Sequence, residues 1–346
     1  MTPASRRNGP VLEVVDPGLL LSVQDGGRQG LASEGVTRGG AADAWSLGVA
    51  NALLGNSLDA AALEATLLGP TVRALATGTV ALAGTMSGRV TQTGERIRPG
   101  SSVTLSAGQE LSLEPALDGV RGYLAVPGGL DVPVVLGSRS TALRGGFGGV
   151  EGRPLRPGDR VVAAGAAGAA DAGRDALVLP RAHWPGDACP APVTAAAPLR
   201  VLPGPHAGDL GADALPALVG RAWTVAHASD RVGLRLDGEP LPAGADGELP
   251  SHGVLAGVIQ VPPDGFPIVL QVDHQPTGGY PLVAVVITAD LPRLGQLGPG
   301  AAVWFELVAP GAAREALARM DAELAGALAH LREAARWDDL WRGAGA

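Results

Sequence analysis

The sequence predicts a mostly-β protein. Short apolar segments rich in β-branched residues recur along the 346 residues, and turns rich in glycine and proline separate them, with 52 Gly and 29 Pro in the chain. This alternation is typical of β-barrels and β-sandwiches. Clear examples are VLEVV at 11–15, TVALAG at 79–84, GYLAV at 122–126 and PIVLQV at 267–272.

Two helices are expected beside the strands. Residues 41–55 predict a short helix in the N-terminal half. Their apolar side chains recur at helical spacing, at Trp45, Val49, Leu53 and Leu54, and a glycine ends the segment. Near the C-terminus a longer segment has an apolar stripe between Arg and Glu residues, which predicts a long amphipathic helix. That stripe comprises Leu317, Met320, Leu324, Leu328 and Leu331.

The chain length suits two domains. A Pro-Gly turn precedes a strand-like segment at 98–105, 156–163 and 298–305 in the pattern of a weak repeat, which indicates related β units in both halves. A stretch rich in Ala, Gly and Pro divides them and is interpreted as a linker. The predicted division is a first β-barrel domain at 11–165, the linker at 166–198, a second β-barrel domain at 199–310 and the helix at 311–341.

Composition excludes several functions. The net charge is −8 and aromatic residues make up 3% of the chain, so we expect no nucleic-acid binding. All 26 basic residues are arginine, so the chain has no lysine for a Schiff base, a phosphate loop or a biotin attachment. The single cysteine, the absence of a signal-peptide pattern and the absence of a long apolar run predict a cytoplasmic protein with no membrane contact and no metal cluster.

Two clusters of polar residues and glycines stand out in the first half. Residues 33–43 precede the predicted helix and contain Arg38, so they are suited to an anion; equally, Asp43 caps the helix and the glycines only form a turn. The second cluster, 136–149, is dense in hydrogen-bond donors and glycines, which favours a ligand loop. Its candidate residues are Arg139, Ser140, Arg144, Gly145 and Gly146.

Two further clusters lie in the second half. Asp230 and Arg231 are either a ligand pair or a surface ion pair at a strand end. The segment DHQPTGGYP at 273–281 is polar between two apolar flanks, and a binding role and a plain turn are equally compatible with it. If the preceding strand continues into it, Asp273 and Gln275 share one face. Thr277 and Gly278 complete this candidate site, and His252 and His274 are weaker candidates.

Taken together, these motifs resemble one family. The motifs occur in the same order along the chain as in that family, and the resemblance extends from about Val11 to Val308. The clearest of them are LLLSVQDGGRQG, RGYLAVPGGLDVPVVLGSRSTALRGGFGG, SDRVGLRLDG and GVIQVPPDGFPIVLQVDHQPTGGYP. The family is that of the 5-oxoprolinase C subunit, also described as allophanate hydrolase subunit 2 or the biotin-dependent carboxyltransferase family. The chain departs from the family pattern at three positions: Gly40, where serine is usual, His252, where glutamate is usual, and His274, where arginine is usual.

The resemblance implies two cyclophilin-like β-barrel domains and a complex with a 5-oxoprolinase subunit-B homologue, with or without a subunit-A homologue. That complex would use ATP to open 5-oxoproline to glutamate, with ATP bound by the complex rather than by this chain alone. Arg38, Arg139 and Arg144 would hold carboxylate or phosphate oxygens. Catalytic roles would fall to Asp273, Gln275 and Asp230, and the remaining substrate-binding candidates are Ser140, Gly145, Gly146, Arg231, Thr277 and Gly278.

Two alternatives remain open at this point. In the first, the chain is the carboxyltransferase component of a biotin-dependent urea or amide carboxylase, with biotin supplied only by another subunit. In the second, it is a non-catalytic regulatory partner of a protein that inhibits a sensor kinase. The sequence alone does not separate 5-oxoproline from urea as the substrate.

Overall fold

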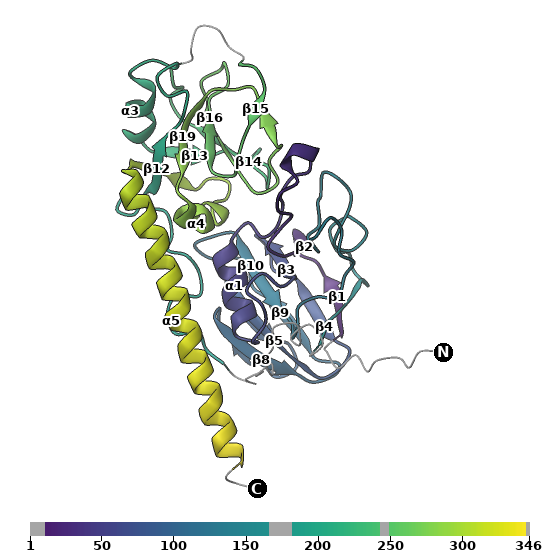
Figure 1. Cartoon of the computed structure of the whole chain (residues 1–346). Helices are drawn as coiled ribbons and strands as arrows, with labels where there is room; N and C mark the ends of the chain where they lie inside the picture. Colours follow the sequence, from purple (N-terminus) through teal and green to yellow (C-terminus); the bar gives the residue numbers. More distant parts are fainter. Residues whose placement is uncertain (1–10, 166–181, 243–248, 344–346) are drawn as a thin grey trace. The chain divides into compact units, whose positions relative to one another are not determined.

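The computed structural model describes residues 11–165, 182–242 and 249–343. Figure 1 shows strands throughout both halves of the chain and one long helix near the C-terminus. The mostly-β prediction is confirmed. Among the described residues, the chain divides into two compact units. The first contains residues 11–27, 44–165, 182–190 and 323–343, and the second contains 28–43, 191–242 and 249–322.

Two antiparallel sheets build the first unit. One has the strand order β11-β1-β4-β9-β6-β7 and the other β2-β3-β10-β5-β8. The first sheet comprises β1 (Val11–Asp16), β4 (Thr71–Ala74), β6 (Gly88–Val90), β7 (Arg96–Ile97), β9 (Glu110–Leu113) and β11 (Arg160–Val162). The second comprises β2 (Leu20–Gln24), β3 (Ala62–Thr66), β5 (Gly78–Gly84), β8 (Ser101–Leu105) and β10 (Arg121–Ala125).

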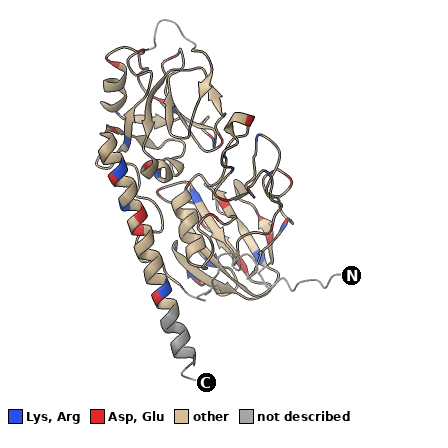
Figure 2. Cartoon of the chain, viewed as in Figure 1, with Lys and Arg blue, Asp and Glu red and all other residues tan. Residues whose placement is uncertain are grey.

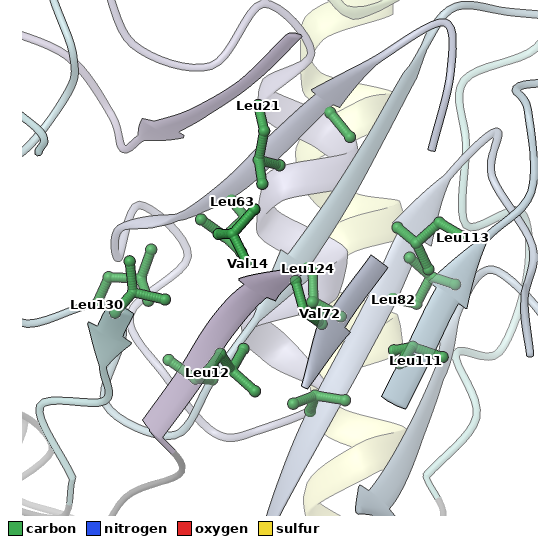
Figure 3. Packing of buried hydrophobic residues seen from close by; sticks show 14 of the residues in the cluster. Leu12, Val14, Leu21, Leu63, Val72, Leu82, Leu111, Leu113, Leu124 and Leu130 are labelled. Atoms are coloured by element: carbon green, nitrogen blue, oxygen red, sulfur yellow. The ribbon is translucent and has the colours of Figure 1, made fainter. Parts of the chain in front are cut away.

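The core of this unit joins its two sheets. Alternate residues of each strand point to one face, so both sheets direct a row of aliphatic side chains into a shared cluster. Figure 3 shows Leu12, Val72 and Leu111 from the first sheet near Leu63 and Leu124 from the second. Most of the buried residues of this cluster are leucine and valine, as the low aromatic content requires.

The short helix predicted in the N-terminal half is confirmed as α1 (Ala44–Ala52), which packs on β5 and β10 (Figure 1). It is shorter than the apolar pattern indicated. Leu53 and Leu54 are buried in the turn that follows. Gly55 ends that turn with a φ of 68°, a left-handed conformation that glycine adopts without steric cost.

One curved sheet dominates the second unit. Its strand order is β20-β13-β14-β17-β16-β19-β12-β21, and only the β12–β21 pair is parallel. The two outer strands, β20 (Ala302–Val303) and β21 (Phe305–Leu307), are separated in the chain by Trp304 alone, so the sheet curls until its edges nearly meet. The others are β12 (Leu199–Pro203), β13 (Trp223–Val225), β14 (Gly233–Asp237), β16 (Val258–Gln260), β17 (Ile268–Leu270) and β19 (Leu282–Val286).

Smaller elements complete the second unit. A two-stranded ribbon pairs β15 (His252–Gly253) with β18 (Thr277–Gly278). A one-turn 3-10 helix, η1, covers Ala32–Glu34, and another, η2 (Thr288–Asp290), leads into α4. Two short helices, α3 (Ala214–Val219) and α4 (Leu291–Gly295), were not predicted. Helices of five or six residues are too short to show a periodic apolar pattern.

The long C-terminal helix predicted at 311–341 is confirmed as α5 (Pro310–Gly343). Figure 2 shows acidic and basic residues interspersed along its described part, in line with the predicted mixed charge. Of the predicted stripe, Leu331 is buried and the other four side chains are half-buried. Among the described helices, none is long and apolar enough to cross a membrane.

The compact units do not follow the boundaries expected from the sequence. Residues 28–43, expected in the first domain, cluster with the second unit. Of the expected linker at 166–198, residues 166–181 lie outside the described structure. The rest of it is held by hydrogen bonds. Ser102 N donates to Ala182 O at 3.0 Å in the first unit, and Arg293 Nη1 donates to Pro198 O at 2.9 Å in the second.

Candidate functional site

In the first unit, the carboxylate of Asp25 organises the loop at 136–149. Asp25 Oδ1 accepts hydrogen bonds from Gly27 N at 2.8 Å, from Ser138 Oγ at 2.6 Å and from Ser140 Oγ. Its Oδ2 accepts from Arg139 N at 2.6 Å. Charge-assisted bonds of this kind are strong, so Asp25 fixes the start of the loop. Sequence reasoning missed this residue, because its partners in the loop lie more than 100 positions further along the chain.

The candidate residues of this loop occupy two different environments. Ser140 is fully buried and bonded to Asp25, and the Arg139 side chain donates to Val132 O at 3.1 Å. Arg144, Gly145 and Gly146 are exposed at the loop tip. The substrate-binding roles expected of these five residues stay predictions. The geometry favours a structural role for Ser140 and leaves the Arg144 guanidinium accessible to an anion.

In the second unit, the segment at 28–43 is held by hydrogen bonds to the turns that follow β17 and α4. Gly39 N donates to Val272 O at 3.0 Å, and Gln296 Nε2 donates to the buried Asp43 Oδ2 at 2.7 Å. The Arg38 side chain is exposed, and its guanidinium faces the Gln29 amide. With the amide oxygen turned toward the guanidinium, Nε and Nη2 donate to it at 3.2 and 3.0 Å. Arg38 is therefore oriented while remaining accessible.

A buried ion pair lies beneath this segment. Arg231 Nε donates to Asp273 Oδ2 at 2.8 Å and Arg231 Nη2 to Asp273 Oδ1 at 3.1 Å, so the pair is bidentate. The same Nη2 donates to Gly40 O at 2.6 Å. Arg231 is 5% and Asp273 7% exposed, which contradicts the surface-pair interpretation of Arg231. The carboxylate of Asp273 is occupied by this pair, and the catalytic role expected of Asp273 stays a prediction.

The preceding strand does not continue as far as Asp273 and Gln275, so the condition for a shared strand face is not met. Strand β17 ends at Leu270, and Val272 and Asp273 form a turn, so the two side chains do not alternate as they would on a strand. His274 N donates to Gln271 O at 3.1 Å in that turn. Gln275 is half-buried, and its backbone carbonyl accepts from His274 Nδ1 at 2.6 Å.

Two titratable residues beside this turn are also structurally engaged. Burial lowers the pKa of His274 below its usual value, and the Gln275 carbonyl and the Asp273 charge offset that effect only in part. Asp230 is exposed, and its Oδ1 accepts from Val232 N at 2.8 Å and Gly233 N at 3.3 Å. This Asx turn directs the chain into β14. The catalytic role expected of Asp230 remains a prediction.

Two buried polar atoms at the β15–β18 ribbon lack partners among the described residues. These are Gln260 Nε2 and His252 Nε2, both inaccessible to solvent. The ribbon contains the candidates Thr277, which is exposed, and Gly278. A Cβ atom at Gly278 would lie 2.5 Å from Gln260 Nε2, so the amide occupies the space that a side chain would fill. Sequence reasoning named His252 as a weak candidate and missed Gln260.

A third polar side chain adjoins the ribbon. The ring of His206 lies 5.0 Å from that of His252, centroid to centroid. His206 Nδ1 accepts from Leu282 N at 3.2 Å, and His252 Nδ1 lies 3.2 Å from Pro250 O. Among the described residues, no group of three or more His, Cys, Asp or Glu side chains is placed to hold a metal ion.

This fold and sequence define a carboxyltransferase-domain protein. The family model of the carboxyltransferase domain, subdomains A and B, matches residues 34–307, and the chain belongs to this family. Within it, the chain is a homologue of the 5-oxoprolinase C subunit, as the sequence motifs indicated. It is 38% identical over 303 residues to the 5-oxoprolinase C subunit of Escherichia coli, covering 85% of this chain and 90% of that protein.

Other relatives extend the comparison. The 5-oxoprolinase C subunit of Haemophilus influenzae is 33% identical over 298 residues, which covers 86% of this chain and 91% of that protein. The crystal structure of the Kluyveromyces lactis urea carboxylase superposes with a TM-score of 0.79 at 29% identity. That match covers 92% of this chain and 29% of the urea carboxylase, so the chain corresponds to one region of a much longer protein.

Proposed function

We propose that this chain is the C subunit of an ATP-dependent 5-oxoprolinase, which opens the lactam ring of 5-oxoproline to glutamate together with a subunit-B homologue, with or without a subunit-A homologue. The observation that carries the proposal is the 38% identity to the E. coli C subunit over 90% of that protein. ATP would be bound by the complex, because this chain has no lysine for a phosphate loop. The two units would correspond to the two cyclophilin-like barrels expected of the family.

The geometry supports a division of roles among the expected site residues. Arg38 and Arg144 are exposed guanidinium groups, each suited to a carboxylate or phosphate oxygen. Arg231 and Asp273 would act as positioning residues that hold the 28–43 segment through Gly40. Gln275, Thr277 and Gly278 lie at or beside the ribbon and would contact the amide substrate. The cytoplasmic location expected from the sequence also remains a proposal.

A second candidate function is supported by the structural match to the urea carboxylase. The chain would then transfer a carboxyl group from carboxybiotin to urea or a related amide. Biotin would have to come from another subunit, since it is attached to proteins through lysine and this chain contains none. Both functions require recognition of an amide group.

The experiment is reconstitution. The full chain is co-expressed with subunit-A and subunit-B homologues from the same genome, and ATP-dependent glutamate formation from 5-oxoproline is measured, with each protein omitted in turn. Turnover that needs this chain supports the proposal. Turnover without it, or none with all three, overturns it. Carboxylation of urea in the presence of a biotin carboxylase and its carrier would instead establish the second function, and association without either activity would indicate a regulatory role.

A further inference from the structure

The ribbon formed by β15 and β18 places two unsatisfied polar atoms on the same face. His252 pairs directly with Gly278 across the ribbon, and directly paired residues project their side chains to the same side. The Cβ direction of Gly278 leads to Gln260 Nε2 at 2.5 Å. The His252 side chain and the Gln260 amide therefore lie on the same side of the ribbon.

Hydrogen bonds define what each group offers. Because the Pro250 carbonyl is an acceptor, His252 Nδ1 carries the proton in the neutral ring and Nε2 is an acceptor. Because Leu282 N donates to His206 Nδ1, the proton of the neutral His206 ring is on Nε2, which is a donor. Gln260 Nε2 is a donor. The two unsatisfied atoms are thus one donor, Gln260 Nε2, and one acceptor, His252 Nε2.

Leaving such atoms unsatisfied is costly. Gln260 is 2% exposed, and no described residue bonds to its Nε2 or to His252 Nε2. The two atoms are complementary, one a donor and one an acceptor, yet no hydrogen bond joins them. A buried polar group without a partner destabilises the folded protein, so its retention in a packed sheet indicates a role with a ligand.

We propose that Gln260 and His252 bind the amide edge of the substrate. The substrate carbonyl oxygen accepts from Gln260 Nε2, and the adjacent substrate N–H donates to His252 Nε2. A lactam presents its carbonyl and its N–H on one edge, which matches this pattern. The inference deepens the proposed function and rests on it for the choice of 5-oxoproline as the ligand.

The covering ribbon sets a condition on binding. Both unsatisfied atoms are shielded from solvent, so a ligand reaches them only when the ribbon shifts. Each strand of the ribbon has only two residues, and Gly253 and Thr277 are exposed, so few contacts oppose that movement. Gly278 is needed here because any larger side chain would displace the Gln260 amide.

The test compares Gln260→Leu with Gln271→Leu. Gln271 is equally buried at 2% exposure, but its Nε2 donates to Leu294 O at 3.2 Å, so it serves as the matched control with a satisfied amide. In the reconstituted complex we expect Gln260→Leu to raise KM for 5-oxoproline at least about tenfold, and to raise the Tm of the chain by removing an unsatisfied group. Gln271→Leu should lower Tm and leave KM unchanged.

A second variant, His252→Leu, tests the hydrogen bond between the substrate N–H and His252 Nε2. The probe is the lactone analogue of 5-oxoproline, in which the ring N–H is replaced by oxygen, used as a competitive inhibitor. The wild-type complex should bind the lactam more tightly than the lactone, and His252→Leu should remove this preference. If KM and the lactam preference are unchanged in Gln260→Leu and His252→Leu, the two atoms bind only a buried water and the inference is overturned.

Failure of the proposed function is recognised separately. If the wild-type complex shows no turnover of 5-oxoproline, binding of 5-oxoproline to the full chain is followed by saturation-transfer NMR. Binding that Gln260→Leu abolishes and Gln271→Leu retains would support the amide site without the proposed reaction. Absence of 5-oxoproline binding to the wild-type chain would overturn both the proposed function and the proposed amide site.

Discussion

Arg231 and Asp273, 42 positions apart in the chain, form a buried bidentate ion pair that also holds the backbone of Gly40. Removing one member of such a pair leaves a buried charge without its partner, which costs far more than an exposed pair is worth. The pair therefore connects a candidate site residue to the stability of the second unit.

Replacing Asp273 by asparagine should destabilise the protein by about 3 kcal/mol, because the Arg231 charge stays buried without its counter-charge. Urea-induced unfolding of the full chain measures this. Asp230→Asn is the control: this exposed residue uses only acceptor oxygens in its turn, and asparagine retains one, so the change should stay within about 0.5 kcal/mol. Equal stability of the two variants would contradict the buried-pair interpretation.

In the loop at 136–149, a substitution at the base should lower thermal stability, whereas a substitution at the tip should weaken binding. Ser140→Ala removes a buried donor to Asp25 and should cost about 1–3 kcal/mol in thermal unfolding experiments. Arg144→Ala alters an exposed tip and should leave Tm unchanged, while weakening substrate or partner binding in the complex by about 2 kcal/mol. A large Tm loss in Arg144→Ala with unchanged binding would show that the tip is structural.

Leu136 adopts a left-handed conformation at the tip of a hairpin. Its φ is 53°, the next residue, Gly137, has a φ of 79°, and Val135 pairs with Ser138. This is the geometry of a type I′ turn, which favours asparagine at the first position. Leu136→Asn should therefore stabilise the chain by about 0.5–1 kcal/mol in urea unfolding. Val134→Asn, an exposed neighbour, should give no comparable gain.

Acid should destabilise the second unit through His274. Its pKa is lowered in the folded protein, chiefly by burial, so the unfolded chain binds the proton more readily. The contribution of neutral His274 to stability is complete above the unfolded pKa of about 6.5 and is lost as the pH falls below it. Unfolding measured between about pH 7 and pH 5 should show this loss, and His274→Gln should reduce the slope.

Local patterns in the sequence determined much of the architecture. Alternating apolar residues predicted the strands, Pro-Gly turns preceded β8, β11 and β20, and apolar spacing predicted α1 and α5. Ordered motifs over most of the chain indicated the family. These features depend on residues within a few positions of one another, because strand and helix periodicity and turn geometry are local properties.

Only the tertiary structure decided which polar side chains meet. Asp25 receives hydrogen bonds from residues 113 to 115 positions away, and the 28–43 segment belongs with the second unit rather than with its neighbours in the chain. The end of β17 at Leu270 turned Asp273 toward Arg231 and not into a strand face. Local sequence patterns carry no signal for such contacts, since long-range closure and core packing bring these residues together. For the same reason the amide of Gln260, one more polar residue at a strand end in the sequence, became a candidate ligand group only when Gly278 was seen to lie above it.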